Sequence, residues 1–150
     1  MIKYKKDTDH IVTLTLDMQG RSTNIINHEL SSTLVPVIEH LQAEKKKGTL
    51  RGVIITSGKK TFLQGGDLEY LFRAERAEEI FALAERFKEV LRSLERPGVP
   101  VVAAINGTAL GAGFELALAC HHGIALEDKQ LRVGFPETKL GVFPSGGGIT

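Results

Sequence analysis

Strands and helices alternate along the 150 residues of this chain, which predicts an α/β fold in a single domain. Three local patterns support the prediction. Residues 11–17 alternate apolar and polar side chains, and residues 77–94 repeat apolar side chains at helical spacing. Residues 101–105 form a short apolar run that is rich in β-branched side chains. These patterns are typical of a half-buried strand, an amphipathic helix and a buried strand.

The first half of the chain predicts a strand, a helix and a second strand. The strand places three apolar side chains on one face: Val12, Leu14 and Leu16. Apolar residues at helical spacing over 30–47 predict the helix, and Gly48 ends it. Pro36 lies inside this helix and predicts either a kink or a later start, because proline removes a helical hydrogen bond. Residues 53–56 then form a buried strand.

The second half continues the alternation. The helix over 77–94 has one apolar face, which consists of Phe81, Ala84, Phe87, Leu91 and Leu94. After the strand at 101–105, a loop with several glycines leads into a helix predicted at 115–120. Two short strands are predicted at 124–126 and 131–133. A further helix is expected to begin at Thr150, so we expect this chain to be part of a longer protein.

Composition narrows the function classes. The net charge of +1 argues against nucleic acid or an anionic membrane as the main partner. Cys120 is the only cysteine, so an intrachain disulfide is impossible, and a buried, inert thiol is expected. The N-terminus lacks the apolar stretch of a signal peptide, and no apolar run is long enough to span a membrane. We therefore expect a cytoplasmic protein.

The segment at 62–68 is the first that can bind a ligand. Its two glycines, Gly65 and Gly66, let the backbone approach a ligand closely or adopt a positive φ. Asp67 can cap a helix that follows. A tight turn between a strand and a helix explains the same residues, so this segment alone does not establish a site.

The second segment, at 106–115, ends a buried strand and opens a helix. Free N–H groups at a helix start bind negative charge, and Glu115 lies one helical turn beyond Ala112. Glu115 alone is equally well explained as a residue that complements the helix dipole. A dinucleotide fingerprint is a poor match, because Leu116 stands where the third glycine is required.

The third segment, at 134–148, combines glycines, prolines and apolar residues around Glu137, which alone would be read as a surface turn residue. Elsewhere in the sequence, the histidines show no spacing typical of metal ligands. The G-x-S-x-G motif of serine hydrolases is also missing. The sequence therefore predicts neither a metal site nor the nucleophile motif of a serine hydrolase.

Taken together, the three segments resemble the crotonase (enoyl-CoA hydratase/isomerase) superfamily. The resemblance runs from Ile11 to Gly148. It rests on Phe62-x-x-Gly65-x-Asp67-Leu68, on Asn106-Gly107-x-x-x-Gly111-x-Gly113-x-Glu115, and on Pro136-Glu137-x-x-x-Gly141-x-x-Pro144-x-x-Gly147-Gly148. The run from Glu115 to His121 and the early Asp17-Met18-x-Gly20 resemble the hydratase part of the multifunctional fatty-acid oxidation α-subunits. Those proteins carry a 3-hydroxyacyl-CoA dehydrogenase after the hydratase.

The resemblance implies a fold and a set of residue roles. The fold is a spiral of ββα turns, of which residues 1–150 would be the N-terminal portion without the C-terminal trimerisation helices. The backbone N–H groups of Gly66 and Ala112 would form an oxyanion hole, although most hydratases have glycine where Ala112 stands. Glu115 and Glu137 would be catalytic. The implied substrate-binding residues are Gly65, Asp67, Leu68, Gly111, Phe135, Pro136 and Phe143.

The implied activity is hydration of the 2,3 double bond of an enoyl-CoA in fatty-acid β-oxidation. A Δ3,Δ2-enoyl-CoA isomerase or another acyl-CoA enzyme of the superfamily is the nearest alternative, because isomerisation can use a single glutamate. An inactive acyl-CoA-binding fragment is an alternative of a different class. No permanently bound cofactor is implied, since coenzyme A belongs to the substrate. The full-length protein would form a homo-oligomer or belong to a fatty-acid oxidation complex.

Overall fold

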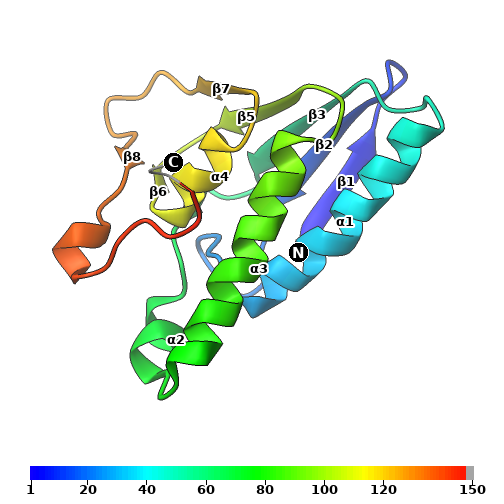
Figure 1. Ribbon diagram of the computed structural model, residues 1–150. Coiled ribbons are helices and arrows are strands. Elements are labelled where there is room, and N and C mark those ends of the chain that lie inside the picture. Colours follow the sequence, from blue (N-terminus) through cyan, green and yellow to red (C-terminus); the bar gives the residue numbers. More distant parts are fainter. Residues whose placement is uncertain (148–150) are drawn as a thin grey trace.

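The computed structural model describes residues 1–147, and its main body is a five-stranded sheet with two long helices packed on one face (Figure 1). The strand order is β1 (Ile2–Lys6), β2 (Ile11–Leu16), β3 (Gly52–Ser57), β5 (Val101–Ile105) and β7 (His122–Ala125). β1 runs antiparallel to β2, and every other neighbouring pair is parallel. Parallel neighbours require crossover connections, which contain helices here, and the α/β class is confirmed.

A second, smaller sheet consists of three parallel two-residue strands: β4 (Leu63–Gln64), β6 (Ala109–Leu110) and β8 (Val133–Gly134). Each of them follows a long strand and precedes a helix. β3 leads through β4 to α2 (Leu68–Arg73), and β5 leads through β6 to α4 (Ala112–Leu118). β7 leads through β8 to the 3₁₀ helix η1 (Glu137–Leu140). This repeat is the expected spiral of ββα turns.

The two long helices are α1 (His28–Lys46) and α3 (Ala77–Glu95), which pack against each other over the sheet (Figure 1). α1 begins before the proline, so the later start is wrong. The Asn27 side chain caps α1 by accepting a hydrogen bond from the Leu30 N–H at 2.9 Å. Pro36 lies on the exposed face, where water can satisfy the Ser32 carbonyl that loses its helical partner.

The core lies between the sheet and these helices. The predicted face of β2 is confirmed, since all three of its apolar side chains are fully buried: Val12, Leu14 and Leu16. The apolar face of α3 divides into two parts. Phe87, Leu91 and Leu94 are buried in the core, whereas Phe81 is 66% exposed. Within residues 1–147, no helix combines the length and apolar character needed to cross a bilayer.

Several element boundaries differ from the prediction. The helix predicted at 115–120 is α4 at 112–118, and the strands predicted at 124–126 and 131–133 are β7 and β8. The strands β1, β4 and β6 were not predicted. Two-residue strands have no periodicity of their own and are defined by their ladder partners, which the sequence does not reveal. The ends of the resemblance at Gly148 and of the chain at Thr150, where a helix was expected, lie outside the described residues.

Candidate active site

The small sheet brings the three candidate segments together. Its strands are in register, with Leu63 opposite Ala109 and Ala109 opposite Val133. The segments that follow the strands therefore leave the sheet at the same edge. They contain Gly65-Gly66 after β4, Gly111-Ala112 after β6, and Phe135 to Glu137 after β8. Residues that are far apart in the sequence thus become neighbours.

The first two segments turn in the same way. Gly65 has a φ of 76° and Gly111 a φ of 55°, a region that glycine adopts at little cost. The next residue in each segment is Gly66 or Ala112. The backbone N–H groups of these two residues donate no hydrogen bond to any residue of 1–147. Neighbouring strands lie ~4.8 Å apart, so the two free N–H groups stand side by side at one sheet edge.

Glu115 lies in the first turn of α4 and is only 3% exposed. Its Oε1 atom accepts hydrogen bonds from the Gly146 N–H at 2.8 Å and the Gly147 N–H at 3.1 Å. These donors hold the carboxyl group in place. The second oxygen is also closely surrounded, because a Cβ atom at Gly146 would lie 2.7 Å from Oε2.

Glu137 is the first residue of η1 and is half-buried. Its Oε2 atom is shielded from solvent and has no hydrogen-bond partner within residues 1–147. Its Oε1 atom faces the turn after β6, where a Cβ atom at Gly111 would lie only 2.7 Å away. Burial raises the pKa of this carboxyl, and the charge of Glu115 raises it further, although the residue's own backbone N–H opposes the shift.

Glu115, Glu137 and the two residues with free N–H groups, Gly66 and Ala112, all line a single cavity of about 510 Å³. The remainder of the wall is mainly apolar. α2 and the N-terminal half of α3 contribute Leu68, Leu71, Ile80, Leu83, Ala84 and Phe87. Opposite them are apolar residues of the segment that follows β8, including Val142 and Phe143. The cavity can hold an apolar chain with its polar end at the glutamates.

Every residue that the sequence marked as a candidate lines this cavity except Phe135. The Phe135 ring packs against Phe114, with ring centroids 5.2 Å apart. Asp67 lines the cavity, caps α2 through its bond from the Tyr70 N–H at 3.2 Å, and lies 3.5 Å from Arg21. Sequence reasoning missed the α3 wall, although it had placed Ala84 and Phe87 on the apolar face of this helix.

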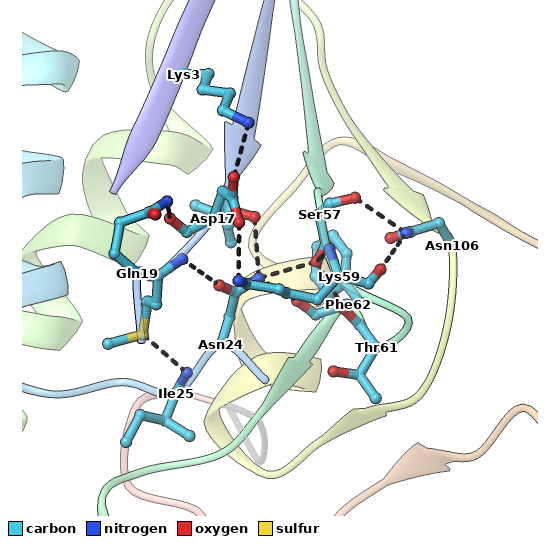
Figure 2. A network of polar contacts seen from close by, with 12 residues as sticks. Lys3, Asp17, Gln19, Asn24, Ile25, Ser57, Lys59, Thr61, Phe62 and Asn106 are labelled. Atoms are coloured by element: carbon cyan, nitrogen blue, oxygen red, sulfur yellow. Dashed lines mark hydrogen bonds and ion pairs between the residues drawn. The ribbon is translucent and has the colours of Figure 1, made fainter. Parts of the chain in front are cut away.

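A polar network joins the ends of β2 and β3 to the turn before β4 (Figure 2). The carboxylate of Asp17 lies 2.7 Å from the Lys3 ammonium and 2.9 Å from that of Lys59. Hydrogen bonds from these two lysines lower the pKa of Asp17 to about 2. Within residues 1–147, no three His, Cys, Asp or Glu side chains are grouped so that they could hold a metal ion.

Comparison with known proteins agrees with this geometry. The model of the enoyl-CoA hydratase/isomerase family matches residues 7–150. The fatty acid oxidation complex subunit alpha of Shewanella loihica is 39% identical over 139 residues, which cover 92% of this chain and 19% of that protein. The corresponding subunit of Shewanella oneidensis is 37% identical over 141 residues, or 93% of this chain and 20% of that protein. The chain thus spans about a fifth of these relatives.

Solved structures show the same fold. An enoyl-CoA hydratase from Bacillus anthracis superimposes with a TM-score of 0.88 at 31% identity, over 98% of this chain and 55% of that protein. Pseudomonas aeruginosa DspI gives a TM-score of 0.84 at 28% identity, over 98% of this chain and 57% of that protein. The likeness therefore extends over nearly all of the chain.

Proposed function

The chain belongs to the enoyl-CoA hydratase/isomerase family, and on that premise we propose that it adds water across the 2,3 double bond of an enoyl-CoA thioester. The acyl-CoA would come from fatty-acid β-oxidation, in keeping with relatives that are named as subunits of a fatty acid oxidation complex. One observation supports hydration above all. Two glutamates, Glu115 and Glu137, line the same cavity as Gly66 and Ala112, whose backbone N–H groups have no partner within residues 1–147.

The two N–H groups account for activation of the thioester. When water adds to the β-carbon, negative charge develops on the thioester oxygen. The N–H groups of Gly66 and Ala112 would donate hydrogen bonds to that oxygen. Because the chain already holds them at one sheet edge, little reorganisation is needed as the charge develops, and losing one such donor costs about 3–4 kcal/mol in known enzymes.

The two carboxyl groups divide the proton transfers. Both would hold the reacting water through hydrogen bonds, while its oxygen attacks the β-carbon and the π bond breaks. Glu137 would deliver a proton to the α-carbon, and the proton lost by the water returns to the glutamate pair, so the reaction balances as addition of one water. The raised pKa of Glu137 suits it to act as the acid.

The proposal is tested by following the loss of enoyl-thioester absorbance when the protein is mixed with crotonoyl-CoA. We expect hydration by the wild type and none by Glu137→Gln, which should still bind the thioester because the N–H donors are unchanged. Glu127→Gln, at an exposed loop position, is the matched control and should hydrate like the wild type. An active Glu137→Gln variant would sink the assignment.

A second substrate separates hydration from isomerisation. Isomerisation of a 3-enoyl-CoA moves one proton between two carbon atoms and can use one carboxyl group, so Glu115→Gln should retain it while losing hydration. If the wild type isomerises the 3-enoyl-CoA but leaves crotonoyl-CoA unchanged, the protein is an isomerase and the hydratase proposal is wrong. A protein that binds both thioesters and converts neither would fit the inactive acyl-CoA-binding fragment.

A further inference from the structure

Asn24 is a fully buried amide that joins three separate segments of the chain (Figure 2). Its Nδ2 atom lies within hydrogen-bonding distance of the Leu16 carbonyl at 3.0 Å, the Ser57 Oγ at 2.9 Å and the Phe62 carbonyl at 3.3 Å. Its Oδ1 atom accepts a bond from the Met18 N–H at 3.0 Å. The side chain thereby ties the ends of β2 and β3 to the residue that precedes β4.

The backbone after Asn24 pairs with the segment that carries Gly66. The Asn24 carbonyl accepts a hydrogen bond from the Gln64 N–H at 2.9 Å. Two residues later, Ile26 forms a parallel bridge to Gly66. The Ile26 N–H donates to the residue before Gly66 at 2.7 Å, and its carbonyl accepts from the residue after Gly66 at 3.0 Å. Residues 24–26 therefore extend the small sheet on the side of β4 opposite to β6.

This pairing determines the direction of the Gly66 N–H. In a parallel ladder, the bridging residue bonds to the two neighbours of its partner and leaves the partner's own N–H pointing away. The Gly66 N–H is left without a partner within residues 1–147, and Gly66 lines the cavity. Residues 17–27 between β2 and α1 form no long strand or helix, and the Asn24 side chain links them through hydrogen bonds to the Met18 N–H and the Leu16 carbonyl.

We propose that Asn24 is a positioning residue that holds the Gly66 N–H in its place in the oxyanion hole, an inference that rests on the function proposed above. Asn24 does not contact the substrate and acts through residues 24–26 and 64–67. A buried amide with satisfied hydrogen bonds also stabilises a fold in general. The test must therefore separate local positioning from overall stability.

The test compares Asn24→Ala with Asn106→Ala. Asn106 donates to the Ser57 carbonyl at 3.0 Å and the Lys59 carbonyl at 3.0 Å, within the same network. It forms no hydrogen bond to residues 64–67. Both variants lose the side-chain hydrogen bonds of one asparagine, which are buried at Asn24 and partly buried at Asn106. Only Asn24→Ala releases the partner of the oxyanion segment.

The first readout is amide hydrogen exchange in the ligand-free protein. In Asn24→Ala, the Gln64 and Asp67 amides should exchange about tenfold faster relative to the core amide of Leu14, as expected for local loosening equal to one lost hydrogen bond. In Asn106→Ala, that ratio should stay at the wild-type value. Equal ratios in the two variants would overturn the proposal, because general destabilisation speeds all amides that exchange by global unfolding.

The second readout is spectroscopic. The absorption of a conjugated aryl-enoyl-CoA thioester moves to longer wavelength when hydrogen bonds polarise its carbonyl. We expect Asn24→Ala to bind this probe but lose most of the wavelength shift, with kcat for crotonoyl-CoA reduced about tenfold or more and KM changed much less. Asn106→Ala should keep the shift. A full shift with unchanged kcat in Asn24→Ala would overturn the inference.

These experiments distinguish failure of the proposed hydratase function from failure of the proposed role of Asn24. A wild type that neither shifts the probe nor hydrates crotonoyl-CoA overturns the proposed function, and the exchange ratio then still decides whether Asn24 anchors residues 64–67. If Asn24→Ala does not fold, Ser57→Ala removes only one of the three acceptors around Nδ2. Ser57→Ala should change both the exchange ratio and the wavelength shift in the direction expected for Asn24→Ala, but by a smaller amount. If neither quantity changes, the proposal is overturned.

Discussion

Gly113 is the position at which α4 lies directly against β4, and substitution by alanine should force these two elements apart. A Cβ atom at position 113 would lie 2.0 Å from the Leu63 carbonyl oxygen and 2.9 Å from Leu63 Cδ2. Ordinary contacts begin at 3.4 Å, so raising the shorter distance from 2.0 Å to 3.4 Å requires a separation of about 1.4 Å.

This separation of α4 from β4 would distort the proposed oxyanion hole. Ala112 precedes Gly113 in α4, and Gly66 follows the β4 strand that begins at Leu63. Moving α4 away from β4 therefore moves the two N–H donors apart. A misplacement of about 1 Å can cost 10²-fold in rate, and loss of one oxyanion donor costs about 10²–10³-fold. We expect kcat/KM to fall about 100-fold or more, with roughly 1–3 kcal/mol lost from the free energy of unfolding.

The assay is hydration of crotonoyl-CoA, combined with urea denaturation of the same preparations. Gly123→Ala in β7 is the matched control, because a Cβ atom there would lie 3.9 Å from Ile105 Cδ1, an ordinary contact. This control should keep the wild-type rate. If Gly113→Ala retained the wild-type kcat/KM, or if Gly123→Ala lost as much activity, the reasoning from backbone approach would be refuted.

Four further predictions concern three titratable groups. Because the pKa of Glu137 is raised, its proton is lost at a higher pH than usual, so kcat/KM should fall as pH rises through the raised pKa. The same raised pKa means that the wild type loses stability as pH rises through it, because the folded protein holds the charged carboxyl unfavourably. Urea denaturation should therefore show that the free energy of unfolding of Glu137→Gln, compared with that of the wild type, is larger at pH 7 than at pH 4. The pKa of Asp17 is lowered from 3.8 to about 2 by Lys3 and Lys59, so Asp17→Asn should be less stable than the wild type at neutral pH, and equal stability there would contradict the ion pairs. The difference should shrink as pH falls from 3.8 to about 2, where the wild-type carboxyl also becomes neutral. Cys120 was expected to be buried and is half-buried in the structure. Desolvation still raises the pKa of its thiol to about 12, so a thiol reagent at pH 8 should label it slowly until urea unfolds the protein, and rapid labelling without urea would contradict the raised pKa.

Much of the fold followed from patterns within short stretches of sequence. The alternation of Val12, Leu14 and Leu16 predicted one buried face, and the apolar run at 101–105 coincides with β5. The helical spacing over 77–94 predicted α3 to within one residue at its end. These properties are local, because a strand or helix with one apolar face shows its period wherever it packs.

The same local reasoning misjudged where side chains pack. Phe81 has the spacing of the α3 apolar face, yet it is 66% exposed because the N-terminal half of α3 extends beyond the sheet and forms a cavity wall. Phe135 lies beside a candidate catalytic residue in the sequence, yet its ring packs on Phe114 away from the cavity wall. Periodicity assigns a residue to a face but does not specify what covers that face.

The sequence by itself determined the alternating elements and the family, and it predicted the pair of glutamates, because each depends on residue types at fixed spacing along the chain. Only the tertiary structure decided that Gly66 and Ala112 follow neighbouring strands, and that Gly146 and Gly147 hold the carboxyl of Glu115. The raised pKa of Glu137 likewise comes from its surroundings in the fold. The physical reason is that hydrogen bonds, burial and electrostatic shifts act between atoms close in space, and here they join residues that are dozens of positions apart in the chain.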